Sequence, residues 1–466
     1  MMRRLGKTNL QVSEIGFGAY RIHEAVQEHH FALELALNSG INLIDTSINY
    51  TNGGSERLVG QILQGVDRQK MVLVTKGGCL QGDLYQAYQD QAFQEGLILD
   101  NTMVYCIHPD CLEWQLSTSL DRLMQDHVDI YLIQNPEYYL ISAEKKGLSV
   151  YDAEKTCLDG LEKAFSYLEQ QVKKGRIHWY GISSNTLSLP SDQFRYLSLE
   201  KIMGIAGPHF GVIQFPLNLL ERSAILEENA SQNQTLMTLC QQYDLGVLTN
   251  RPLNALQKDT VIRLTEIGVL LDQVDEHDVR QLLEQFSEFE KQIWASGISA
   301  LGLSIQEETK IQELLAFTQE LQETWMNFSG YINWREVLQS YILPKLEDVM
   351  DIVSSSSQFD EQGWFVSYMT LLKNVLTSIS SYYQFISLSH HRSLKIKVQN
   401  QVSSWHTPTL QHTAIRALRE TKGISSILVG MRKPIYVKEA LEELACPILP
   451  KENTNDWQAL DQVLPK

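Results

Sequence analysis

The sequence contains the run INLIDTSINY at residues 41–50, and a second run, MVLVTK, follows at residues 71–76. Each run begins with a short, mostly apolar segment and ends on polar side chains. Continuous apolar patterning without strict alternation is typical of strands that are buried on both faces of a parallel sheet. The two runs therefore predict buried strands of an α/β fold.

Eight such runs occur along the chain, and amphipathic helical stretches lie between them. Eight alternating units close into a barrel more readily than they form an open sheet. We therefore predict a (β/α)8 TIM barrel, preceded by a small hairpin over residues 4–12 that would plug the barrel floor. The predicted strands are Glu14–Gly18, Ile41–Asp45, Met71–Thr75, Asp129–Gln134, Ile177–Ile182, Gly211–Phe215, Leu245–Thr249 and Ser425–Val429.

One interval interrupts this alternation. From about residue 255 to about residue 404 the pattern indicates long helices and no strand. We predict that residues 1–254 and 405–466 form the barrel and that residues 255–404 form an α-helical insertion between the seventh and eighth β/α units. Loops that follow barrel strands open on the active-site end, so the insertion would fold over or beside the mouth.

The overall charge excludes several classes of partner. The 466 residues include 39 Lys and Arg against 56 Asp and Glu, which gives a formal net charge of -17. Such a surface repels nucleic acid and anionic lipid. The N-terminus lacks the apolar segment of a secretory signal, and six cysteines are scattered without metal-binding spacing. We expect a cytoplasmic protein with no metal site and no nucleic-acid or membrane partner.

Three side chains at the predicted strand ends suggest a chemistry. Asp45 and Lys76 end two neighbouring strands, and Tyr50 follows Asp45 by five residues. A nearby ammonium lowers the pKa of a phenol, and a carboxylate keeps that ammonium charged and oriented. A tyrosine in this setting can protonate an alkoxide as hydride reaches a carbonyl carbon. A structural Asp–Lys ion pair beside a core tyrosine fits the same spacing equally well.

Further motifs match a known family in its own order. DTSINY at 45–50, GGSE at 53–56 and VTK at 74–76 are accompanied by RLGKTNLQVS at 4–13, GISSN at 181–185, QFPLN at 214–218 and GISSILVGMR at 423–432. Over residues 1–254 and 405–466 the sequence resembles the aldo-keto reductase superfamily. The insertion lies outside this resemblance.

The resemblance implies that Tyr50 is the general acid and base, that Lys76 lowers its pKa and that Asp45 holds Lys76. Gln134 stands where the family has its active-site histidine. A glutamine can donate a hydrogen bond to a substrate oxygen but cannot transfer a proton near neutral pH. His108, in a loop ahead of the fourth strand, is a candidate replacement, although a capping or solvated role is the simpler interpretation of a loop histidine.

The resemblance also implies a nicotinamide dinucleotide, NADP in preference to NAD. Ser183, Ser184 and Asn185 would bind the carboxamide, with Gln214 near the ring. Arg251, between Asn250 and Leu253, would meet the pyrophosphate. The remaining implied contacts, at the adenosine end, are Gly430, Met431, Arg432 and Glu439.

Two functions of different classes follow. The first is an NADP-dependent oxidoreductase that acts on a small aldehyde, ketone or sugar-like substrate. The alternative is a cofactor-binding sensor or scaffold with weak catalysis, whose segment 255–404 binds a protein partner. Gln134, Asn250 and the length of the insertion motivate this alternative.

Overall fold

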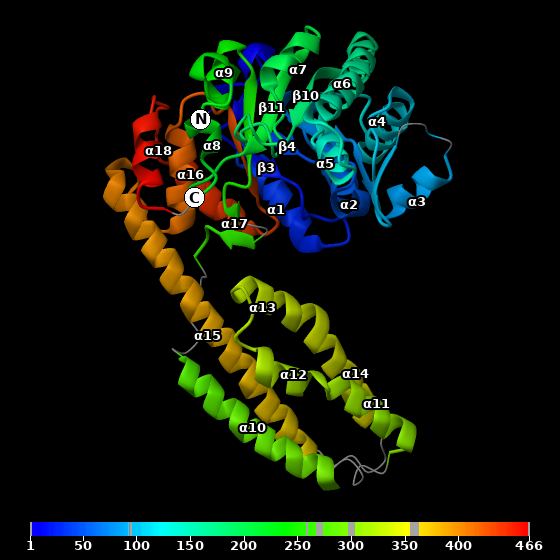
Figure 1. Cartoon of the computed structure of the whole chain (residues 1–466), viewed down its shortest axis with the longest axis vertical. Coiled ribbons are helices and arrows are strands. Elements are labelled where there is room, and N and C mark those ends of the chain that lie inside the picture. Colours follow the sequence, from blue (N-terminus) through cyan, green and yellow to red (C-terminus); the bar gives the residue numbers. More distant parts are fainter. Residues whose placement is uncertain are drawn as a thin grey trace. The chain divides into compact units, whose positions relative to one another are not determined.

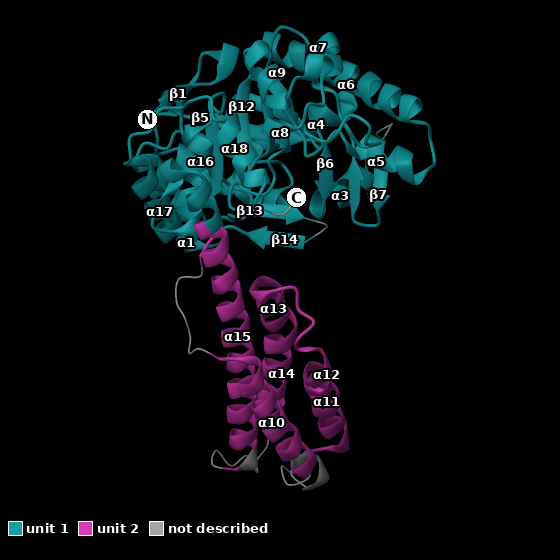
Figure 2. Cartoon of the chain, turned by 60° about the vertical axis from the view of Figure 1, so that its left-hand side comes forward, with its two compact units in different colours: residues 1–264, 397–466 teal, residues 265–396 magenta. Residues whose placement is uncertain are grey.

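The computed structural model describes residues 2–91, 93, 96–257, 260–266, 274–296, 303–354 and 363–464. The chain forms two compact units, drawn in two colours in Figure 2. The first, the barrel unit, contains residues 1–264 and 397–466, and the second, the helical unit, contains residues 265–396. The helical unit is thus shorter at both ends than the segment 255–404 that the sequence marks as an insertion.

The barrel unit is built on eight parallel strands that close on themselves, as the sequence predicts. Each observed strand lies within two residues of its predicted bounds, because local apolar runs bounded by turns specify buried strands well. In barrel order the strands are β3 (Ile15–Gly18), β4 (Leu43–Asp45), β5 (Val72–Gly77), β9 (Val128–Gln134), β10 (Ile177–Ser183), β11 (Phe210–Pro216), β12 (Gly246–Asn250) and β15 (Ser426–Gly430).

Helices surround these strands (Figure 1). Several begin at a residue whose side chain accepts a backbone N–H of the first turn. Ser149, for example, accepts from Asp152 at 3.1 Å at the start of α6. The helices of this unit are α1 (Gln27–Asn38), α2 (Gly54–Leu63), α3 (Asp83–Gln89), α4 (Pro109–Leu123), α5 (Tyr138–Lys145), α6 (Val150–Lys173), α7 (Leu199–Ile205), α8 (Ser223–Leu226), α9 (Leu236–Gln242), α16 (Leu410–Glu420), α17 (Pro434–Leu444) and α18 (Thr454–Asp461).

The predicted N-terminal hairpin is present. It pairs β1 (Met2–Arg4) with β2 (Gln11–Ser13) in antiparallel register. Leu5 and Val12 have no exposed surface and belong to the cluster of strand side chains that fills the barrel. The hairpin thus contributes apolar side chains to the barrel core.

Two further sheets were not predicted. One contains β6 (Cys79–Gln81), β8 (Met103–Tyr105) and β7 (Leu97–Asp100), and the other is the hairpin of β13 (Asn254–Gln257) and β14 (Thr260–Arg263). The prediction that no strand occurs from residue 255 onward was therefore wrong at the start of that interval. Strands of three or four residues are too short for a period-2 pattern to stand out in the sequence.

The helical unit folds around a core of its own. Phe286, Trp325, Trp334 and Tyr368 are buried together in one apolar cluster. Its helices are α10 (Glu276–Ser296), α11 (Ile305–Leu315), α12 (Phe317–Thr324), α13 (Tyr331–Val337) and α14 (Leu343–Ser354), with a π-helical turn at Leu338–Ile342, and α15 (Trp364–Gln401), which continues into the barrel unit. None of the helices described reaches the length and apolar character that a membrane span requires.

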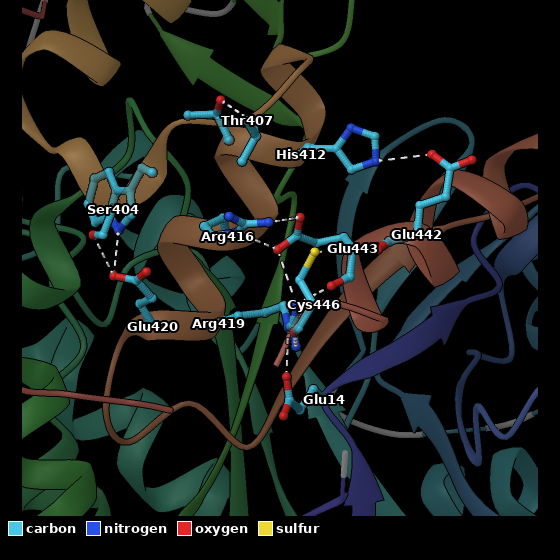
Figure 3. A network of polar contacts seen from close by, with 12 residues as sticks. Glu14, Ser404, Thr407, His412, Arg416, Arg419, Glu420, Glu442, Glu443 and Cys446 are labelled. Atoms are coloured by element: carbon cyan, nitrogen blue, oxygen red, sulfur yellow. Dashed lines mark hydrogen bonds and ion pairs between the residues drawn. The ribbon is translucent and has the colours of Figure 1, made fainter. Parts of the chain in front are cut away.

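A buried ion network joins the last β/α unit to the first strand (Figure 3). Arg419 on α16 places its Nε 2.7 Å from Glu14 Oε2, directly before β3, and its Nη1 3.1 Å from Glu443 Oε1 on α17. Arg416 also binds Glu443, at 2.8 Å. The Arg419 side chain has no exposed surface, and both carboxylates are 1% exposed. Removing one partner of such a network leaves charge buried without compensation.

We expect Arg419→Met to lower the free energy of unfolding by about 3–5 kcal/mol, because Glu14 and Glu443 would lose their buried counter-charge. Lys422→Met is the matched control, since Lys422 pairs with Glu452 on the surface with side chains 57% and 66% exposed. The control should change the free energy by less than about 1 kcal/mol. Urea titrations followed by tryptophan fluorescence measure both. Equal effects in the two variants would contradict the assigned role of the network.

Candidate active site

The carboxyl ends of the barrel strands bring together polar side chains that are far apart in sequence. Asp45 ends β4, Lys76 lies next to the end of β5, Gln134 ends β9 and Ser183 ends β10. The strands are parallel, and Ser183 pairs in register with both Gln134 and Gln214. These side chains therefore meet at one end of the barrel, the end at which β/α barrels carry their active sites.

Lys76 is the centre of this group. Its Nζ lies 2.7 Å from Asp45 Oδ2, 2.8 Å from the Thr46 carbonyl oxygen and 3.2 Å from the Tyr50 hydroxyl. The Lys76 side chain has no exposed surface, and Asp45 is 6% exposed. An ammonium has three N–H donors, so all three are used. Lys76 is therefore held in one position, and Tyr50 is within its reach.

Burial and the neighbouring charges both shift the pKa values of Lys76 and Tyr50. Burial lowers the pKa of Lys76, but Asp45 and Tyr50 raise it by more, so the net pKa is raised and the lysine stays charged. Burial raises the pKa of Tyr50, and Lys76 lowers it only in part while Asp45 raises it further. The net pKa of Tyr50 is therefore above its ordinary value. The sequence predicted the direction of the Lys76 effect, but the larger effect of burial was missed.

A chain of amide and hydroxyl groups extends from the other oxygen of Asp45. Gln214 donates through Nε2 to Asp45 Oδ1 at 2.8 Å. Gln214 Oε1 in turn accepts from Ser183 Oγ at 2.8 Å and from Asn250 Nδ2 at 3.4 Å. Ser183 and Gln214 are both buried. Five strand ends thus contribute to one hydrogen-bonded network around Asp45.

Gln134 joins the same region through Ser47. The Ser47 hydroxyl lies 2.8 Å from Gln134 Oε1, while Gln134 Nε2 donates to no group within the described parts of the chain. The amide is thereby oriented with its acceptor engaged and its donor available.

His108 lies near this end of the barrel, because the N–H of the neighbouring Cys106 donates to the Gly78 carbonyl just beyond β5. His108 is the N-cap of α4, and its Nδ1 accepts the Asp110 N–H at 3.4 Å. The Nδ1 atom of His108 is thus engaged in helix capping.

Asn185 and Arg251 form a second group with two acidic residues. Arg251 donates to Asn185 Oδ1 at 3.0 Å and to Glu221 Oε1 at 2.5 Å. Asn185 donates through its backbone N and its Nδ2 to Glu137 Oε1, both at 3.0 Å. The side chain of Ser184, the third predicted carboxamide contact, bonds with the hydroxyl of Thr186 at 3.4 Å.

The sequence interpretation missed both carboxylates of this group. Glu137 is 2% exposed, and burial raises its pKa. A glutamate that follows Asn135-Pro136 inside a largely apolar stretch was a weak signal of this burial, and Glu221 had no signal in the sequence.

The residues predicted to contact the adenosine end of the cofactor form no hydrogen bond with the group around Lys76 or with the group around Arg251. Gly430 is exposed at the end of β15, and Arg432 is half-buried. Arg432 forms no hydrogen bond or ion pair with the residues that the structure describes. Met431 is fully buried. Glu439 lies on α17, half-buried, and burial raises its pKa. Leu253 is half-buried after β12.

Comparison with known proteins places this geometry in a family. The family model described as "Aldo/keto reductase family" matches residues 14–261. An uncharacterized oxidoreductase of Bacillus subtilis is 26% identical over 201 residues, which cover 43% of this chain and 54% of that protein. The NADH-specific methylglyoxal reductase of Escherichia coli is 30% identical over 139 residues, which cover 28% of this chain and 40% of that protein. The chain thus spans about half the length of the curated relatives that it matches.

Among solved structures, an aldo-keto reductase of Bacillus halodurans in its holo form aligns with 98% of this chain and 95% of its own, at 15% identity and a TM-score of 0.49. The family model covers more than half of the chain, from the first barrel strand to the hairpin after the seventh. The chain therefore belongs to the aldo/keto reductase family.

Proposed function

We propose that this protein is an oxidoreductase that uses NADP to interconvert a carbonyl group and an alcohol on a small aldehyde, ketone or sugar-like substrate. The observation that carries this proposal is the buried contact of Lys76 with both Asp45 and Tyr50. An ion pair with a purely structural role does not need a tyrosine hydroxyl beside the lysine. Proton transfer to a substrate oxygen does need such a hydroxyl.

In reduction, the Tyr50 hydroxyl donates its proton to the substrate oxygen as the carbonyl carbon is reduced, and in oxidation it takes that proton back. The Lys76 ammonium stabilises the phenolate that remains, and Asp45 keeps the ammonium charged and in place. A bound nicotinamide would supply the hydride in one direction and accept it in the other.

Gln134 acts as a hydrogen-bond donor to the same substrate oxygen. Its Oε1 is engaged by Ser47, so its Nε2 is the atom that can donate. An amide orients and polarises a carbonyl but does not exchange a proton near neutral pH. We therefore assign proton transfer to Tyr50 alone.

The residues around these strand ends fit a nicotinamide dinucleotide. Ser183, Gln214 and Asn250 offer amide and hydroxyl groups to a carboxamide, and Asn250 Oδ1 is buried without a protein partner among the described residues. Arg251 and Arg432 offer cations for phosphates in a protein of net charge -17. The cations Arg432 and Lys433 favour NADP, and the name of the Escherichia coli relative makes NAD the alternative.

We expect Tyr50→Phe to reduce kcat for carbonyl reduction at least about a hundredfold, because the proton donor is removed. Tyr20→Phe is a matched control, since the Tyr20 ring contacts Tyr50 edge-to-face at 4.9 Å between centroids and is 60% exposed. The control should keep its activity. NADPH oxidation in the presence of a panel of aldehydes and ketones measures both variants. Tight cofactor binding without turnover in the wild type would instead favour the sensor or scaffold function.

The raised pKa of Tyr50 predicts the pH dependence of each direction. Because burial holds the pKa of Tyr50 above its ordinary value, the phenol stays neutral and the proton donor for reduction is present throughout pH 6–9. We expect kcat for reduction to be flat over this range and kcat for alcohol oxidation to rise with pH, because oxidation needs the phenolate. Initial rates in each direction test this expectation, and a decline in reduction centred near pH 7 would contradict it.

Arg432→Met should raise the KM for NADPH about tenfold and leave that for NADH unchanged, because only NADPH carries the extra phosphate that this cation would meet. Lys422→Met is the control, since Lys422 precedes β15 at its opposite end. Initial-rate measurements with both cofactors decide between NADP and NAD. An equal rise in KM for NADPH and NADH would show that Arg432 does not contact the extra phosphate of NADPH.

A further inference from the structure

A second group of potential ligands lies at the opposite end of the barrel. His127 directly precedes β9, and Asp129 is the second residue of β9. His178 is the second residue of β10, and β10 is in register with β9 through the pairs Ile177 with Val128 and Trp179 with Ile130. Asp129 and His178 are therefore neighbours on adjacent strands, at the amino ends.

The three side chains are on the outer side of the sheet. Ile130 belongs to the apolar cluster inside the barrel, so Asp129, its neighbour in the strand, points the other way. The imidazole nitrogens of His127 and His178 and a carboxylate oxygen of Asp129 all lie within 4.8 Å of one another. The two rings have centroids 4.6 Å apart, and Asp129 Oδ1 is 3.5 Å from His178 Nδ1.

Two hydrogen bonds hold the Asp129 carboxylate through its Oδ2 oxygen. Asp129 Oδ2 accepts from Arg68 Nη2 at 2.7 Å and from the Leu73 N–H at 2.8 Å. These two bonds fix the position of the carboxylate and leave Oδ1 to face His178. The positive charge of Arg68 disfavours a metal ion at this position. The Arg68 guanidinium, however, contacts Oδ2 and not Oδ1, and it also donates to the Met71 carbonyl at 3.1 Å.

Two imidazoles and one carboxylate suit a particular class of ion. Imidazole nitrogens bind Zn²⁺, Ni²⁺, Co²⁺ and Cu²⁺, whereas Mg²⁺ and Ca²⁺ prefer oxygen donors. Bond lengths of about 2.0–2.1 Å to such an ion need ligand atoms closer together than 4.8 Å. The His178 side chain is 48% exposed, so rotation of its ring can close this distance without moving the strands.

We propose that His127, Asp129 and His178 form a binding site for a divalent transition-metal ion of the zinc type, distinct from the proposed active site. The site would bridge the starts of β9 and β10, with solvent completing the coordination. Because it lies at the amino ends of the strands, it would act on the stability of the barrel and not on the chemistry at its mouth. The sequence predicted no metal site, because the three donors share no recognisable spacing.

The test is a zinc titration against a chromogenic chelator, with chelator-treated protein that carries no histidine tag. The wild type should bind one Zn²⁺ per chain. His127→Ala and His178→Ala should each weaken the affinity at least about tenfold, since each removes a direct ligand. His406→Ala is the control, because His406 is exposed and lies outside the group. Far-UV circular dichroism verifies that each variant is folded.

Equal zinc affinity in all four proteins would overturn the assignment, since the ion would then bind elsewhere. Absence of saturable binding in the folded wild type would overturn it as well. Displacement of the zinc by a modest excess of Mg²⁺ would contradict the imidazole ligands. Retention of the site in Tyr50→Phe, with carbonyl reduction lost, would separate this proposal from the function proposed above.

Discussion

The ion pair between Lys76 and Asp45 is the constraint on which the rest of the candidate site depends. An ammonium without exposed surface would be strongly destabilising without compensation. Its three donors are all satisfied, and the second oxygen of Asp45 is satisfied by Gln214, which Ser183 and Asn250 contact in turn. The polar groups of several strands are therefore coupled. Such a network is arranged before a ligand arrives, which is the condition under which fixed charges act most strongly on a reacting group.

Two of the buried cations of the barrel unit, Lys76 and Arg419, lie at opposite ends of its strands. Lys76 lies near the carboxyl end of β5, whereas Arg419 packs between Glu14, which precedes β3, and Glu443 on α17. The first is surrounded by groups that can exchange hydrogen bonds with a ligand, and the second is enclosed by the Glu14 and Glu443 carboxylates and by the backbone carbonyls of Glu443 and Cys446. This division agrees with the general separation of β/α barrels into an active-site face and a stability face.

The helical unit is organised differently. Its aromatic core is separate from that of the barrel, and Glu290 is buried within it, where it accepts hydrogen bonds from Thr318 at 2.6 Å and Tyr368 at 3.0 Å. A segment with its own packed core has the features of an inserted domain and not of an elaborated loop. The family model ends before this unit, at residue 261.

The sequence by itself determined the barrel, its eight strands and the side chains that stand at the strand ends, because apolar runs and turn residues are local signals. It missed β6, β7, β8, β13 and β14, whose short strands carry no period. It also missed Glu137 and Glu221, which reach Asn185 and Arg251 only through the fold. The tertiary structure alone decided that burial raises the pKa of Tyr50 despite Lys76, and that His108 caps a helix. The physical reason is that desolvation and charge interactions depend on distances between residues far apart in the chain, which no local pattern records.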